Sequence, residues 1–233
     1  DQYRIWNTKP EYDEVLSDYH HYLVAHGYEP DKESNGKMVF SRPFTAHLPE
    51  EHSKATYLGN RVVEFVDQHK EEPFALYANM LEPHPPYDGP FNSQYDPNEL
   101  PQSPVFMESP SENSAGMHRL MAAAQQEQEH DTSGSGNARL FGRDIPPEEA
   151  AAEGPTANTE AAYRDVQARY YGLMTLVDRA VGKILDAVEA AGISDNTIIV
   201  FTSEHGDQMG EHNIFQKVVM YEQSVKVPFL LRV

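Results

Sequence analysis

Residues 197–202 read Thr-Ile-Ile-Val-Phe-Thr, a continuous run of β-branched and aromatic side chains. Such a run is typical of a strand that is buried on both faces of a sheet. A helical pattern precedes it, because apolar side chains recur at helical spacing from Tyr170 to Val188 and Gly192 follows as a stop signal. A helix that leads into a buried strand is half of a β-α-β unit. The stretch therefore predicts an α/β fold with a largely parallel sheet flanked by helices.

Other segments extend this alternation of helix and strand. Residues 53–69 carry apolar side chains on one helical face, and residues 74–80 form a short apolar run of strand length. The run stops at Glu82-Pro83-His84-Pro85-Pro86-Tyr87, where the prolines remove backbone donors. Residues 227–233 form a second strand-like run at the end of the chain. Between the halves, residues 88–160 are rich in Pro, Ser, Glu, Gln and Gly, which predicts a long, variable, partly mobile loop region with at most short helices.

Composition excludes several classes of protein. The chain has 233 residues and a formal net charge of −19, and so acidic a surface argues against nucleic acid as a partner. No apolar run approaches the roughly 20 residues that span a bilayer, so we expect no membrane partner. Cysteine is absent, which excludes a disulfide scaffold and a thiolate metal site within these residues. No signal-peptide pattern opens the chain, and a periplasmic or secreted location of the whole protein stays open.

The chain begins without Met and closes on an apolar run that has nothing after it to cover it. We therefore expect residues 1–233 to be an excerpt of a longer protein and the fold within them to be incomplete.

Polar clusters follow two of the expected strands, and ligands in open α/β sheets bind beyond the carboxyl ends of strands. Glu204 and His205 come directly after residues 197–202, and a carboxylate with an imidazole could be half of a metal site. The alternative is an ordinary acidic loop. Lys217 could balance an anionic substrate, although a solvated lysine is the commoner case. His84 lies between prolines at a rigid backbone position, where a plain turn histidine is the alternative.

Two separated motifs then resemble one family. TIIVFTSEHGDQMGEHNIFQKVVMYEQSVKVPFLLR, residues 197–232, strongly resembles the C-terminal metal-and-sulfate signature of the sulfatase family, within the alkaline phosphatase superfamily. PFALYANMLEPHPPYDGP, residues 73–90, resembles the family strand that ends in Pro-His-x-Pro-Tyr. The resemblance covers most of residues 45–105 and 160–233. It implies a partial sulfatase catalytic domain with an alkaline phosphatase-like fold.

The resemblance also implies roles for individual residues. Glu204 stands where the family has a metal-binding Asp, and His205 where it has Asn or His. Lys217 matches the lysine that contacts the sulfate, and His84 the histidine near the leaving oxygen. The implied cofactor is a divalent metal. Ca²⁺ is the expected ion, and the His205 imidazole in place of Asn makes Mn²⁺ or Zn²⁺ the alternatives. Glu204 is one methylene longer than the usual Asp, so it approaches the ion with a different backbone offset or binds it indirectly.

The family's paired Asp ligands and its Cys-x-Pro-x-Arg or Ser-x-Pro-x-Arg segment, the source of the formylglycine nucleophile, are not found in these residues. We therefore expect the whole protein to be a sulfuric ester hydrolase acting on a sulfated small molecule or glycan, with its nucleophile outside this chain and the isolated chain inactive. Two alternatives stay open. One is a phosphodiesterase or phosphonate monoester hydrolase of the same superfamily, and the other is a noncatalytic metal- or glycan-binding relative.

Overall fold

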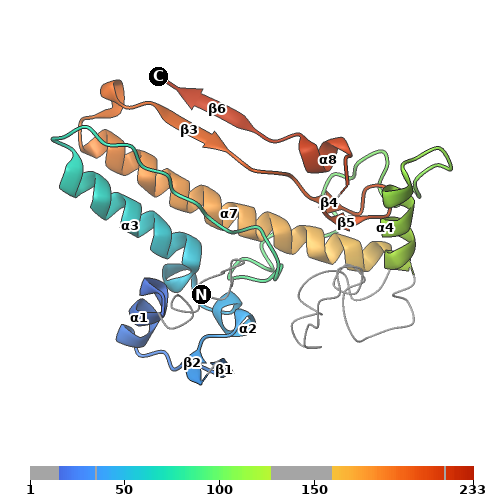
Figure 1. The fold of residues 1–233 in the computed structure, drawn as a ribbon, viewed down its shortest axis with the longest axis horizontal. Helices are drawn as coiled ribbons and strands as arrows, with labels where there is room; N and C mark the ends of the chain where they lie inside the picture. Colours follow the sequence, from blue (N-terminus) through green and yellow to red (C-terminus); the bar gives the residue numbers. More distant parts are fainter. Residues whose placement is uncertain (1–15, 35, 127–158, 218) are drawn as a thin grey trace.

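A long helix, α7 (Glu160–Ala190), is the axis of the structure, a computed structural model that describes residues 16–34, 36–126, 159–217 and 219–233 (Figure 1). Thr159 caps the helix, since its side chain accepts a hydrogen bond from the backbone N–H of Ala162 at 3.2 Å. Gly192 follows the helix with a φ of +70°, a conformation that suits glycine. The helix expected before residues 197–202 is confirmed.

A second helix, α3 (Lys54–His69), packs along α7. The two helices approach closely where Gly59 faces Ala180, because a Cβ atom on Gly59 would lie 3.2 Å from the Ala180 Cβ. Further along, the buried side chains of Val62, Val66 and Val188 form a shared apolar cluster. The helix expected over residues 53–69 is therefore confirmed, and each helix buries its apolar face against the other.

The described strands form three two-stranded antiparallel pairs. β3 (Ile199–Thr202) pairs with β6 (Phe229–Arg232), and the shorter pairs are β1 (Lys32–Ser34) with β2 (Lys37–Val39) and β4 (Gln208–Met209) with β5 (Phe215–Gln216). Both strand-like runs, near residue 200 and near residue 230, are thus strands. The expected parallel sheet is not seen among the described residues, since every strand pair there is antiparallel.

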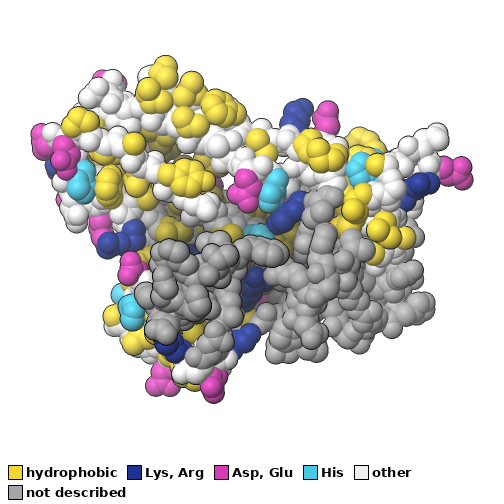
Figure 2. All heavy atoms as spheres, viewed as in Figure 1, with side chains coloured by type: hydrophobic (Ala, Val, Ile, Leu, Met, Phe, Trp, Pro, Cys, Tyr) yellow, Lys and Arg dark blue, Asp and Glu magenta, His cyan; other side chains and the backbone are white. Residues whose placement is uncertain are grey.

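The burial expected for these strands was also wrong. Residues 74–80 are extended but belong to no described strand, and Val200 of β3 and Leu231 of β6 are 51% and 56% exposed. Figure 2 shows hydrophobic side chains on the face where β3 and β6 lie in Figure 1. Apolar runs of strand length need neighbours on both sides to be buried, and the described chain gives β3 only β6 as a partner.

The remaining described elements are short. They are α1 (Asp18–Ala25), α2 (Arg42–Ala46), the 3₁₀ turns η2 (Glu50–His52) and η4 (Ser194–Asn196), α4 (Gly116–Gln126) and α8 (Glu222–Val225). The first part of the expected loop region contains only α4 as a regular helix, and residues 127–158 of it lie outside the described residues. None of the described helices is long and apolar enough to cross a membrane.

The main apolar core joins α7 to two loops. Tyr87, from the proline-rich turn, is buried and lies edge-on to Phe215 of β5, with ring centroids 5.3 Å apart. Tyr163, Leu173 and Leu176 of α7 belong to the same cluster. The core thus fixes the turn that follows residues 74–80 and the loop that follows β3 against one helix.

Candidate functional site

His84 lies in the proline-rich turn, between an extended segment and the buried Tyr87. Its backbone N–H donates to the carbonyl of Leu81 at 3.0 Å, which closes the turn. Its ring Nδ1 lies 2.9 Å from the carbonyl oxygen of Pro85. Because a carbonyl only accepts, Nδ1 carries the proton, and in the neutral ring Nε2 keeps its lone pair. The turn therefore holds the imidazole in one tautomer.

The electrostatics of His84 place two other predicted residues near it. Burial lowers the pKa of His84 to about 4, and the positive charge of Lys217 contributes next. The charges of Arg42 and His205 act in the same direction, against the hydrogen bond to Pro85. Lys217 and His205 come from the loops after β3, more than a hundred residues along the chain. The structure therefore brings His84, His205 and Lys217 into mutual electrostatic reach.

The loop after β3 carries Glu204 and His205. The Glu204 side chain is largely exposed, and its Oε1 lies 3.4 Å from Nε2 of His205. Nδ1 of His205 lies 2.9 Å from the carbonyl oxygen of Gly206, so in the neutral ring Nδ1 carries the proton, and Nε2, beside the Glu204 carboxylate, carries the lone pair. The backbone N–H of Gly206 donates to the carbonyl of Ser224 at 2.8 Å, which holds the loop against α8. A Cβ atom on Gly206 would collide with the carbonyl of Gln223, so this approach requires glycine.

Asp207 is a site residue that sequence reasoning missed. Its Oδ1 is buried without a hydrogen-bond partner. Burial raises the pKa of Asp207, while the positive charges of Lys217 and His205 lower it. The only signal in the sequence is that Asp207 belongs to the same polar run as Glu204 and His205, because burial of one oxygen cannot be predicted from residue types.

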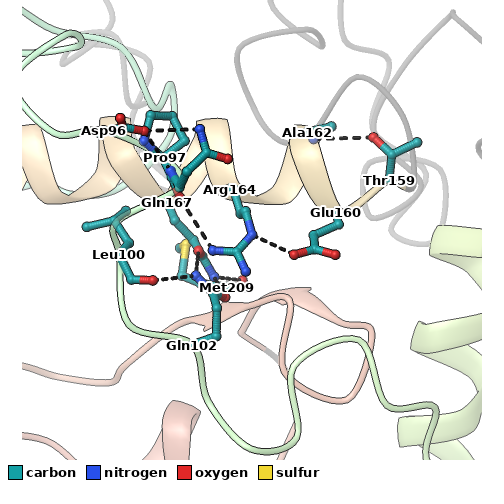
Figure 3. A network of polar contacts seen from close by, with 11 residues as sticks. Asp96, Pro97, Leu100, Gln102, Thr159, Glu160, Ala162, Arg164, Gln167 and Met209 are labelled. Atoms are coloured by element: carbon teal, nitrogen blue, oxygen red, sulfur yellow. Dashed lines mark hydrogen bonds and ion pairs between the residues drawn. The ribbon is translucent and has the colours of Figure 1, made fainter.

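A polar network fastens the β3 loop to α7 from the other side. Gln167 of α7 donates through Nε2 to the backbone carbonyl of Met209 in β4 at 2.7 Å. Nε2 of Gln102 donates to Oε1 of Gln167 at 2.8 Å, and the two amides face each other in Figure 3. Nearby, Arg164 pairs with Glu160 at 2.7 Å. The loop that bears Glu204, His205 and Asp207 is thus tied to α7 as well as to α8.

The arrangement joins the four predicted residues only in part. Lys217 acts electrostatically on both His84 and Asp207, so it lies between the two loops. Figure 2 shows acidic, basic and histidine side chains gathered near the middle of the viewed face. Within the described ranges, no group of three or more His, Asp or Glu side chains is arranged to hold a metal ion. The metal roles of Glu204 and His205 and the substrate roles of His84 and Lys217 stay predictions.

Solved structures define the class of fold. Phosphonate monoester hydrolases from Silicibacter pomeroyi and Agrobacterium radiobacter each match with a TM-score of 0.59, at 20% and 21% identity. The matches cover 92% and 94% of this chain but 40% and 42% of those chains. At such identity the likeness shows the fold alone. The prediction of a fold that mixes helices and strands therefore holds, while the predicted parallel sheet is not confirmed.

The family follows from the sequence comparisons. A model of the sulfatase family matches residues 7–233, and the chain belongs to this family. The multifunctional alkaline phosphatase superfamily protein PehA of Trinickia caryophylli is 27% identical over 190 residues, which is 80% of this chain and 34% of that protein. An arylsulfatase of Clostridium perfringens is 44% identical over 70 residues, which is 30% of this chain and 15% of that protein. The chain thus spans about a third or less of the length of these relatives.

Proposed function

We propose that the protein containing this chain hydrolyses sulfate esters, and that residues 1–233 supply the sulfate-binding and leaving-group side of its catalytic domain. The observation that carries the proposal is that Lys217 and His205, from loops after β3, lie near enough to His84 for their charges to lower its pKa. Cations and a neutral imidazole around one point suit an ester that develops negative charge as it breaks. Relatives named arylsulfatase and ulvan-active sulfatase support sulfate as the group transferred.

Within this proposal Lys217 and His84 have different tasks. The Lys217 ammonium binds the sulfate oxygens, where charge accumulates. His84 is neutral at pH 7 in the protein alone, because burial and Lys217 lower its pKa. An anionic ester beside it raises that pKa, and a protonated Nε2 then donates to the leaving oxygen while the Pro85 carbonyl holds Nδ1. The nucleophile, a formylglycine by the family resemblance, lies outside this chain.

The loop after β3 fits a divalent cation in its donor chemistry. Glu204 offers an exposed carboxylate, His205 offers Nε2, and Asp207 offers a buried oxygen that has no other partner. A bound cation polarises the sulfate oxygens. Oxygen donors suit Ca²⁺, and the imidazole also suits Mn²⁺ or Zn²⁺. We propose that Glu204 and His205 are ligands of a metal site whose remaining ligands lie elsewhere. Asp207 is a neighbouring negative group, because no three of the described side chains are arranged to hold one ion.

A second candidate function is the hydrolysis of phosphonate monoesters or phosphodiesters. The observation that favours it is the match of more than nine-tenths of this chain to the fold of two phosphonate monoester hydrolases. Sulfate and phosphonate esters are both tetrahedral anions, so the same cations serve either.

The test compares two esters with one leaving group in the full-length protein. We expect a higher kcat/KM for 4-nitrophenyl sulfate than for 4-nitrophenyl phenylphosphonate, and loss of both activities after treatment with a chelator. A higher kcat/KM for the phosphonate would favour the second candidate. Activity that survives complete removal of metal would contradict the proposed metal site.

A further inference from the structure

A small cavity of about 60 Å³ opens beside His84, at the N-terminal end of α3. It has room for more than one group the size of a water molecule. Charged side chains and apolar side chains of α7 line it together, among them Arg42, Lys54, Glu82, Asp88, Leu173 and Leu176. Glu204, His205 and Lys217 are not among its lining residues, so the cavity is separate from the proposed metal site.

Glu82 is the unusual member of this lining. Burial raises the pKa of its carboxyl, while the nearby backbone N–H groups of Glu82 itself, of Leu81 and of Ala55, in the first turn of α3, lower it. One of its oxygens, Oε2, is buried without a hydrogen-bond partner. Buried carboxylate oxygens almost always have donors, because an unpaired one has lost water and gained nothing. The orphan oxygen, in the wall of a cavity, therefore points to a donor on a bound molecule.

The neighbouring charges restrict what that donor can be. Lys54 lies close enough to Glu82 for its charge to lower the pKa of that carboxyl, while burial raises it more strongly. Arg42 acts in turn on Lys54. The cavity lining carries charges of both signs, Arg42 and Lys54 against Glu82 and Asp88. A cationic or an anionic group of a bound molecule would therefore meet repulsion as well as attraction there. A hydroxyl group is neutral and both donates and accepts, so it suits either protonation state of Glu82.

The cavity also lies at the expected end of the substrate. His84 lines it and is the residue that we assign to the leaving oxygen, and Glu82 is two residues away in the same turn. Leu173 and Leu176 offer apolar surface to the carbon skeleton that bears a hydroxyl group.

We propose that this cavity is the subsite for the leaving alcohol, and that Glu82 accepts a hydrogen bond from a hydroxyl group adjacent to the ester oxygen. The inference rests on the proposed function and narrows its substrates to esters of polyhydroxylated alcohols, such as vicinal diols. Glu82 is then a specificity-determining residue.

The experiment uses two aryl sulfates that differ in one hydrogen-bond donor and are free of a nitro group that would ionise it, 2-hydroxyphenyl sulfate and 2-methoxyphenyl sulfate, with the full-length protein. The unmutated protein should prefer the hydroxy ester at least tenfold in kcat/KM. Glu82→Gln keeps the shape of the side chain but replaces one carboxylate oxygen by an NH₂ group, which donates hydrogen bonds and cannot accept one. That preference should then fall about tenfold. Glu50→Gln, the same charge change in an ion pair with Arg179 outside the cavity, should leave it unchanged.

The other outcomes overturn the inference in distinct ways. An unchanged preference in Glu82→Gln means that Glu82 does not contact the hydroxyl group. A parallel loss on both esters means that Glu82 only holds the turn of His84. If Glu82→Gln does not fold, the unmutated protein alone tests the inference. A preference for the hydroxy ester below twofold in kcat/KM would show that the cavity is not a hydroxyl subsite. If the unmutated protein hydrolyses neither sulfate ester, the proposed function itself fails, and the inference fails with it.

Discussion

The turn of His84 and the loop of Glu204 to Asp207, which we propose as two halves of one site, are held in different ways. The turn is anchored by the buried Tyr87 and carries a half-buried, neutral histidine. The loop follows an exposed strand and presents a carboxylate of Glu204 that is 76% exposed. The first half of the site is thus built by the packing of the described residues themselves. The second has its backbone fixed, but its donor atoms lack the partners that a metal site needs.

Lys217 links the two halves, and its removal should have the largest effect. Lys217→Ala deletes an ammonium group near both His84 and Asp207. We expect kcat/KM of the full-length protein on 4-nitrophenyl sulfate to fall by about 10²–10³, or about 3–4 kcal/mol of transition-state stabilisation. Lys217→Arg should restore part of the activity, because a planar guanidinium does not reproduce a compact ammonium. Activity within twofold of the unmutated protein would show that Lys217 is an ordinary loop lysine.

The half of the site that contains His84 should make the stability of the protein depend on pH. The pKa of His84 is about 4 in the folded protein and 6.5 in the unfolded chain, so between these values only the unfolded chain binds the proton. The contribution of the neutral His84 to the free energy of unfolding is fully present above pH 6.5 and is lost as the pH falls toward 4. It amounts to about 3 kcal/mol at most, at about 1.4 kcal/mol for each pKa unit.

The measurement is the free energy of unfolding in urea across this pH range. His84→Gln should flatten the slope relative to the unmutated protein. His21→Gln is the control, because it makes the same substitution at an exposed position of α1. Equal slopes in the unmutated protein and His84→Gln would mean that the histidine is not held neutral by its surroundings.

The exposed half should respond to loss of a single donor at Glu204. Glu204→Gln removes the negative charge that attracts a hard cation, so we expect metal affinity of the full-length protein to fall about 10- to 100-fold. Competition with a chromophoric chelator measures this affinity. Glu222→Gln is the matched control, since that carboxylate is also largely exposed and its ion pair is with Lys226, at 3.7 Å. A similar loss in both variants would show that Glu204 acts through general charge and not as a ligand.

The contrast between the two halves also explains what the sequence could predict. Helices α3 and α7 were predicted correctly because their periodic apolar faces are satisfied by neighbours within the described chain. The run at 197–202 was rightly assigned as a strand, but its burial was not, because burial depends on partners that a local pattern does not specify. Its antiparallel pairing with β6 joins residues about thirty positions apart. The periodicity of a local sequence cannot predict which distant strand it pairs with.

The site divides in the same way. His84, Glu204, His205 and Lys217 could be proposed because they follow apolar runs or match a family motif. Asp207 and Glu82 could not, because both are distinguished by one buried, unpaired oxygen. Such an atom is a property of packing around a carboxylate, and the other Asp and Glu residues that the structure describes have the same residue type without it.

The smallest predicted effect concerns the scaffold that supports both halves. Thr159 caps α7 through a hydrogen bond to the N–H of Ala162, and its side chain is exposed and distant from His84 along the helix. Thr159→Ala should lower the free energy of unfolding by about 1 kcal/mol, the usual cost of an N-cap, and Thr159→Ser should restore it. Activity on 4-nitrophenyl sulfate should stay within error, because Leu173 and Leu176, which lie beside His84, are more than three turns further along α7. A loss of activity at unchanged stability would mean that the first turn of α7 contributes to the site directly, and that the two halves share more than a common core.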